Sequence, residues 1–179
     1  MYNLGYNYKF KNNRIMEQII EETVIMIVNY LDSKKWKYEV KEEEDMITFD
    51  TGYQGENEAI YLQIVVLKGR KRNYYIWGSP NITIPKEHIL KGLRVVNRYN
   101  SQAILVNAYL KVENGDIIFW RQHESNETIP EADFIDCLRS VIGVTDLETA
   151  QIFKDILTMK DDDQPKNPPR RKGFFGRFF

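Results

Sequence analysis

The sequence predicts an α+β fold: one antiparallel sheet of about five to six strands, with helices packed mainly on one face. Three observations lead to this fold class. An amphipathic helical pattern comes first, four strand-like segments follow it with only short turns between them, and a hairpin signal stands between two later helical stretches. The predicted order is α-ββββ-α-ββ-α-α. The 179 residues, 42% of them hydrophobic, suffice for a single domain over 15–160 with its own core.

The first helix is predicted over 15–31, because isoleucine, valine and leucine recur there at spacings of three and four residues. Asn12 or Asn13 can cap its start, and Asp32-Ser33 ends it. The polar, tyrosine-rich residues before it, 1–14, are expected to form a flexible leader.

The same helix has more apolar positions than one face requires. Ile25, Met26 and Tyr30 lie off the main stripe. A wide apolar surface favours contacts on two sides of the helix, and this predicts a homodimer.

Alternating apolar residues predict the first strands. Trp36 to Val40 and Ile47 to Thr51 alternate on either side of an acidic turn. Glu58 to Leu67 is largely apolar on both faces, so it is predicted to be central in the sheet and partly covered on both sides. A basic turn, Lys68 to Arg72, leads into the fourth strand at Tyr74 to Trp77.

The second half repeats the two element types. A helix is expected to start near Pro85 and end near Asn100, followed by strands over 103–113 and 116–121. Asn114-Gly115 between these strands is the best hairpin signal in the chain, because both residues tolerate positive φ. Capping boxes at Thr128 and Thr145, separated by Gly143, then predict two further helices.

The expected location is the cytoplasm. The single cysteine, Cys137, cannot form an internal disulfide, the amino terminus lacks the apolar core of a signal peptide, and no apolar run approaches the ~20 residues of a membrane helix.

No motif in the sequence indicates catalysis, and we expect a protein that is not an enzyme and carries no cofactor or metal. Phosphate loops, nucleophile elbows and His-x-x-x-His helices are absent from the sequence. His88 and His123 are isolated, and Cys137 is expected to be a small buried hydrophobe. The alternative is a small enzyme whose loops assemble an acid–base site from residues such as Asp50, Glu58 or His123.

A second alternative is weak nucleic-acid binding through Lys68–Trp77. The basic residues of this segment stand beside rings that can stack on bases: Lys68, Arg70, Lys71 and Arg72, with Tyr74, Tyr75 and Trp77. The chain has a net charge of −1 although residues 165–179 contain five basic residues and no acid. The rest of the chain is therefore acidic, which disfavours nucleic acid as a partner.

The carboxyl-terminal residues form a distinct segment. Residues 161–169 are acidic and then rich in proline, which predicts an extended linker. Residues 170–179 follow as a basic and phenylalanine-rich tail, predicted to dock on a membrane surface or a protein partner, with packing on its own domain as the alternative. The docking residues are Arg170, Arg171, Lys172, Phe174, Phe175, Arg177, Phe178 and Phe179.

Over 15–160 the chain resembles the YbjN-domain family of bacterial proteins, described as sensory transduction regulators. The residues that carry the resemblance are the helix Ile15–Leu31, Trp36-Lys37-Tyr38, Tyr61-Leu62-Gln63, Pro85, Asn97 and Asn114-Gly115-Asp116. The resemblance implies a fold like that of type III secretion chaperones and a dimeric binding scaffold without catalytic residues. Together these observations predict a regulatory or chaperone-like adaptor that binds another protein.

Overall fold

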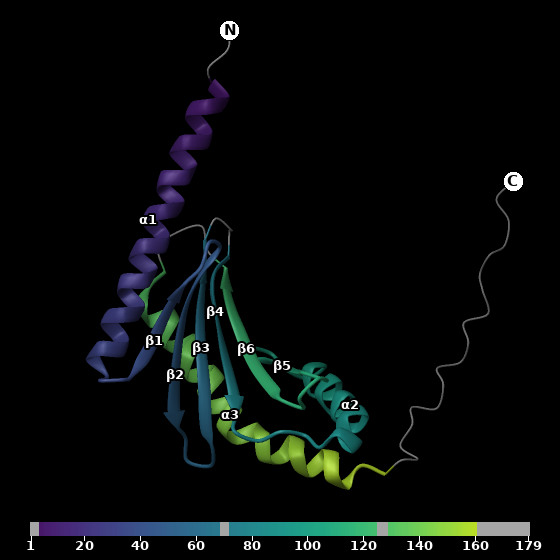
Figure 1. Cartoon of the computed structure of the whole chain (residues 1–179). Coiled ribbons are helices and arrows are strands. Elements are labelled where there is room, and N and C mark those ends of the chain that lie inside the picture. Colours follow the sequence, from purple (N-terminus) through teal and green to yellow (C-terminus); the bar gives the residue numbers. More distant parts are fainter. Residues whose placement is uncertain (1–3, 69–71, 125–128, 161–179) are drawn as a thin grey trace, which may run out of the picture.

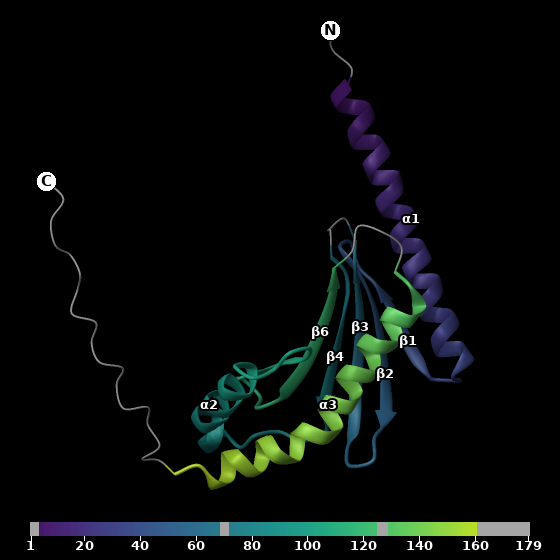
Figure 2. The same ribbon diagram turned by 180° about the vertical axis from the view of Figure 1, so that it is seen from behind.

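The fold is a six-stranded antiparallel sheet with long helices packed on one of its faces (Figures 1 and 2). The computed structural model describes residues 4–68, 72–124 and 129–160. The strands lie in the order β1-β2-β3-β4-β6-β5, which confirms the predicted α+β class. The elements are α1 (Leu4–Ser33), β1 (Tyr38–Glu42), β2 (Met46–Gln54), β3 (Ala59–Leu67), β4 (Arg72–Pro80), the 3-10 turn η1 (Lys86–His88), α2 (Ile89–Asn100), β5 (Asn107–Leu110), β6 (Ile117–Glu124) and α3 (Glu131–Thr158).

Helix α1 begins earlier than its apolar pattern. It runs from Leu4 to Ser33, so it starts before the predicted start at residue 15, and the predicted end at Asp32-Ser33 is confirmed. The flexibility of residues 1–14 stays a prediction. Hydrophobic spacing marks only the part of a helix that packs on a core, and the first turns of α1 project beyond the sheet (Figure 1).

Strands β1 to β4 form a meander whose register aligns one apolar row. Phe49, Ile64 and Ile76 are direct neighbours on β2, β3 and β4, and all three are fully buried. Because side chains alternate along a strand, this row and the rows parallel to it point toward the helices. Strand β3 is central, as its apolar sequence predicted.

The second half of the chain forms β5, which is one of the two edge strands of the sheet. Helix α2 packs against β5, and the side chain of Asn100 accepts from the Ala108 N–H at 2.8 Å and donates to the Ala108 carbonyl at 2.7 Å. These bonds occupy the outer edge of β5, which would otherwise be open to strand addition.

The turn between β5 and β6 is wider than a two-residue hairpin. The Lys111 N–H donates to the Asp116 carbonyl. Within this turn only Gly115 has positive φ, at 81°. Asn114 therefore does not adopt the conformation that motivated the hairpin prediction. Instead its side chain bonds to Asp116, and Gly115 contacts the backbone of Ile84.

The two last predicted helices are one continuous helix, α3. Pro130 is its N-cap, no side chain caps it, and Thr128 lies outside the described residues. The second capping box does not begin a helix, because the Thr145 hydroxyl donates to the Val141 carbonyl one turn earlier. The apolar contacts of α3 with the sheet continue on both sides of Gly143, and they outweigh the weak helix propensity of a single glycine.

Helix α1 packs beside α3 through aromatic rings. The Tyr30 ring meets the Phe134 ring edge-on at 5.4 Å, and Phe134 meets Tyr74 of β4 at 5.7 Å. Tyr30 and, in part, Met26 therefore serve the chain's own core, whereas Ile25 is 51% exposed. Of the three residues off the main stripe, only Ile25 is exposed, and the homodimer stays a prediction.

Helix α3 crosses β4 at Gly78 with almost no space between helix and strand. A Cβ at this position would lie 2.6 Å from Thr145 Oγ1 and 2.9 Å from Val141 Cγ1. Gly143, by contrast, has open space around its missing side chain. We expect Gly78→Ala to lower the free energy of unfolding by about 1–3 kcal/mol through overpacking. Gly143→Ala should raise it by up to about 1 kcal/mol, since alanine favours the helix.

Urea denaturation of both variants measures these changes. Equal stabilities for wild type and Gly78→Ala would contradict the close contact between α3 and β4.

Candidate functional site

The face of the sheet opposite the helices is uncovered among the described residues, and we call it the open face (Figure 1). One row of direct neighbours runs across it through five strands. Its members are Asp50, Gln63, Trp77, Trp120 and Asn107. Each of these residues alternates with a buried core residue, so the register that builds the core also fixes the open face.

Five rings on this face, which we call the aromatic cluster, come from four strands. They are Tyr61, Tyr75, Trp77, Tyr109 and Trp120. The rings of Tyr75 and Trp77 stack at 5.2 Å with 23° between their planes, and Tyr61 is 51% exposed. Burial raises the pKa of Tyr109, and the nearby Tyr75 phenol raises it further. The cluster is therefore a partly exposed aromatic surface on a rigid sheet.

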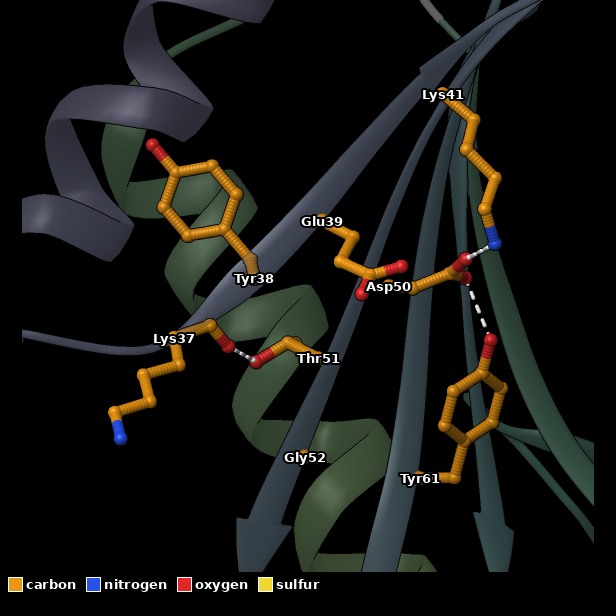
Figure 3. A pocket seen from close by; sticks show the side chains of 8 residues that line it. All are labelled: Lys37, Tyr38, Glu39, Lys41, Asp50, Thr51, Gly52 and Tyr61. Atoms are coloured by element: carbon orange, nitrogen blue, oxygen red, sulfur yellow. Dashed lines mark hydrogen bonds and ion pairs between the residues drawn. The ribbon is translucent and has the colours of Figure 1, made fainter.

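Asp50 organises the polar part of the open face, where β1, β2 and β3 border an open hollow (Figure 3). Its carboxylate accepts hydrogen bonds from Lys41 Nζ at 2.5 Å, Tyr61 hydroxyl at 2.6 Å and Gln63 Nε2 at 2.8 Å. Burial raises the pKa of Asp50, but these donors outweigh it and hold the pKa below its ordinary value. Burial and the bond to Asp50 raise the pKa of Tyr61 to about 12.

A second hollow lies at one end of the sheet, between the end of β2, the start of β3, the end of β4 and Asp116, next to the β2–β3 turn. The turn is fixed by Asp146 of α3. The Asp146 carboxylate accepts hydrogen bonds from the backbone N–H groups of Glu56, Asn57 and Glu58 at 2.9–3.0 Å. One rim of the open face is thus held by a residue of the opposite layer.

The residues of the enzyme alternative do not converge. Asp50 lies on the open face, whereas the His123 ring stacks on the core residue Tyr74 at 5.5 Å. Glu58 lies in the β2–β3 turn, and only its backbone bonds to Asp146. Cys137 is buried, as predicted, and burial raises the pKa of its thiol to about 11. Among the residues that the structure describes, no cluster of histidine, cysteine and carboxylate groups could hold a metal.

The predicted basic cluster is divided by the fold. Lys68 donates to Glu42 at 2.6 Å and to the Glu43 carbonyl at 2.8 Å, so its charge is engaged within the chain. Tyr74 faces the core, while Tyr75 and Trp77 belong to the aromatic cluster. Arg72 opens β4, and Arg70 and Lys71 lie outside the described residues.

The linker 161–169 and all predicted docking residues of 170–179 also lie outside the described residues. Within the described ranges, no helix combines the length and the apolar character needed to cross a membrane.

Sequence reasoning found part of the open face and missed the rest. Tyr75 and Trp77 were identified as stacking rings, but Tyr109 and Trp120 belong to a distant hairpin. The available signal was the alternation in β6, where Trp120 separates Phe119 from Arg121. That pattern assigns Trp120 to one face of its strand, but only the pairing of β4 with β6 brings it beside Trp77.

Comparison with protein-family profiles and with curated proteins gives no match. Among solved structures, the crystal structure of an uncharacterized protein from Methanothermobacter thermautotrophicus is similar, with 14% sequence identity and a TM-score of 0.47. The similarity covers 75% of this chain and 96% of that one. It carries no information on function.

The Asp146 contact yields a prediction on stability and pH. Burial raises the pKa of Asp146, but the backbone hydrogen bonds from Asn57, Glu58 and Glu56 outweigh it and lower the pKa below its ordinary value. The carboxylate therefore stabilises the fold at pH values above about 4, and this contribution is lost as the pH falls through the folded-state pKa.

We expect Asp146→Asn to lower the free energy of unfolding at neutral pH by about 1–3 kcal/mol, since the amide nitrogen cannot accept the hydrogen bonds. Urea denaturation from pH 7 to pH 3 should show the difference from wild type shrinking below about pH 4. Asp45→Asn, in an exposed turn, is the control and should change little. A difference independent of pH would contradict the assigned role of the Asp146 charge.

Proposed function

We propose that the chain is a non-enzymatic, regulatory or chaperone-like adaptor that binds another polypeptide on its open face. The observation that supports this proposal is the aromatic cluster, which lies on a sheet face that no described helix covers (Figures 1 and 2). Tyrosine and tryptophan are enriched at the energetic centres of protein interfaces, because their large rings lose little conformational entropy on binding.

The construction of the face favours binding over chemistry. Its rings come from paired strands and are held in place by the register of the sheet, so a partner meets a surface that is already organised. The indole N–H and phenol O–H groups can hydrogen-bond to a polypeptide backbone while the rings pack on its side chains.

The charges of the face favour a polypeptide over a nucleic acid. The charged groups that line its hollow are the carboxylates of Glu39 and Asp50 and the ammonium groups of Lys37 and Lys41, so the hollow has no net positive charge, and Lys41 is paired with Asp50. Phosphate groups require unpaired cations, and the acidic body of the chain adds repulsion.

The resemblance to the YbjN-domain family supports the same function, since it implies a regulatory binding scaffold without catalytic residues. The tail, residues 170–179, would supply a second contact, with a membrane surface or a partner. Under this proposal the homodimer of the resemblance and the cytoplasmic location stay predictions.

The open face can be tested with a phage-displayed random peptide library selected on the purified full chain. We expect enriched peptides whose binding is weakened about 30-fold by Trp77→Thr or Trp120→Thr, because removal of a central aromatic residue costs about 2 kcal/mol. Threonine keeps the strand propensity of each position, and thermal denaturation shows whether the variants remain folded.

Leu147→Gln is the matched control, since Leu147 is 67% exposed on α3 in the opposite layer. Its peptide binding should equal that of wild type. Selection of no peptide, or equal loss of binding in the control, would refute the assignment of the open face as a protein-binding surface.

The tail has its own test. Four basic residues near an anionic surface contribute roughly 4 kcal/mol, and one or two inserted phenylalanine rings bring the affinity to about micromolar. If the tail docks on a membrane, truncation after Pro169 should abolish co-sedimentation with anionic vesicles and leave the melting temperature unchanged. If the tail packs on its own domain, truncation should lower the melting temperature. Continued sedimentation of the truncated chain would exclude the tail as the membrane contact.

A further inference from the structure

We propose that residues 165–179 are an intramolecular ligand of the open face, so that the chain keeps its own binding surface occupied until a partner displaces the tail. This inference rests on the proposed function of the open face, and it adds a regulatory contact that the adaptor proposal does not require.

The described chain ends near the half of the sheet that carries Trp120. Helix α3 ends at Thr158, and Lys91 Nζ of α2 donates to the Met159 carbonyl at 3.0 Å. Helix α2 packs on β5, which is the edge strand next to β6 (Figure 1). The described chain therefore ends beside α2, near the β5 edge of the sheet.

The linker is long enough to reach the aromatic cluster. Residues 161–169 can span roughly 30 Å when extended, since each residue covers about 3.3–3.6 Å. The distance from β5 across β6 and β4 to β3 is about 15 Å at the usual strand spacing, and passage from the helix layer to the open face adds roughly 10 Å. Pro165, Pro168 and Pro169 favour an extended chain, so the reach is not lost to coiling.

The tail and the open face have complementary chemistry. The tail carries four phenylalanine rings and four cations after Pro169, and the cluster offers indole and phenol rings on which both can pack. The Glu39 and Asp50 carboxylates and the exposed acidic turn Glu42–Asp45 lie on the β1–β2 side of the same sheet, where they attract arginine and lysine.

Tethering makes even a weak contact significant. A short flexible linker gives an effective concentration of about 1 mM, so a tail whose free peptide bound with a dissociation constant of about 100 µM would occupy the face about nine-tenths of the time. A free partner must compete with this occupancy. Its apparent affinity is then about tenfold weaker than for a chain with an inactive tail.

Tryptophan fluorescence of the full chain tests the contact. The chain has three tryptophans, of which Trp77 and Trp120 belong to the open face, whereas Trp36 packs against Tyr30 and Tyr53 on the helix side. Acrylamide, an uncharged quencher, should quench the wild type less than a variant with Phe174→Ala, Phe175→Ala, Phe178→Ala and Phe179→Ala. The same four substitutions in a Trp77→Phe, Trp120→Phe background, where only Trp36 fluoresces, should change nothing.

Binding of a library-selected peptide gives a second measurement. It should be about tenfold tighter for the four-alanine variant than for wild type. Equal quenching of the two chains would overturn the proposal, as would a quenching difference that persists when only Trp36 remains. Protection that appears only with rising protein concentration would assign the tail to a second copy, and protection that requires anionic vesicles would assign it to a membrane; either result excludes the intramolecular contact.

The two proposals fail in different ways. Selected peptides that bind both chains equally would leave the adaptor function intact and remove the tail contact. A quenching difference without any selected peptide would establish the tail contact and leave the adaptor function without its partner.

Discussion

The close packing of α3 across β4 determines how the two faces of the sheet differ. At Gly78 the helix lies so near the strand that Val141 and Thr145 occupy the space of a side chain. Such an approach lets the rows on either side of β4 bury their side chains against α3, and α1 then packs beside α3 through Tyr30 and Phe134. Both long helices therefore lie on one face, and alternation along every strand directs the remaining residues to the other.

The strand register that aligns the core residues therefore also determines which residues lie on the open face. Residues that would be polar on an ordinary half-exposed sheet are here tryptophan and tyrosine on four strands. Exposed aromatic surface gains free energy when a partner covers it. The five partly exposed rings are the feature on which the proposed binding function rests, and among the described residues Asp50 and His123 lie apart.

The polar groups around this face mainly give it rigidity. The Asp50 carboxylate accepts hydrogen bonds from three side chains on the open face. The Asp146 carboxylate of α3 accepts hydrogen bonds from three backbone N–H groups of the β2–β3 turn. These bonds hold β1, β2 and β3 in place beside the aromatic cluster. Under the proposed function, a partner would therefore meet a surface that is already ordered in the free chain.

The sequence by itself determined the fold class, the central place of β3, the end of α1 and the buried state of Cys137, because hydrophobic periodicity is a local property of each segment. It did not determine the start of α1, whose first turns lie outside the apolar pattern, or the continuity of α3, where packing against the sheet overrides the glycine and the second capping box. The tertiary structure alone decided the site. Tyr61, Tyr75, Trp77, Tyr109 and Trp120 become one surface only through strand pairing, and pairing depends on contacts between residues far apart in the chain, which no local pattern encodes.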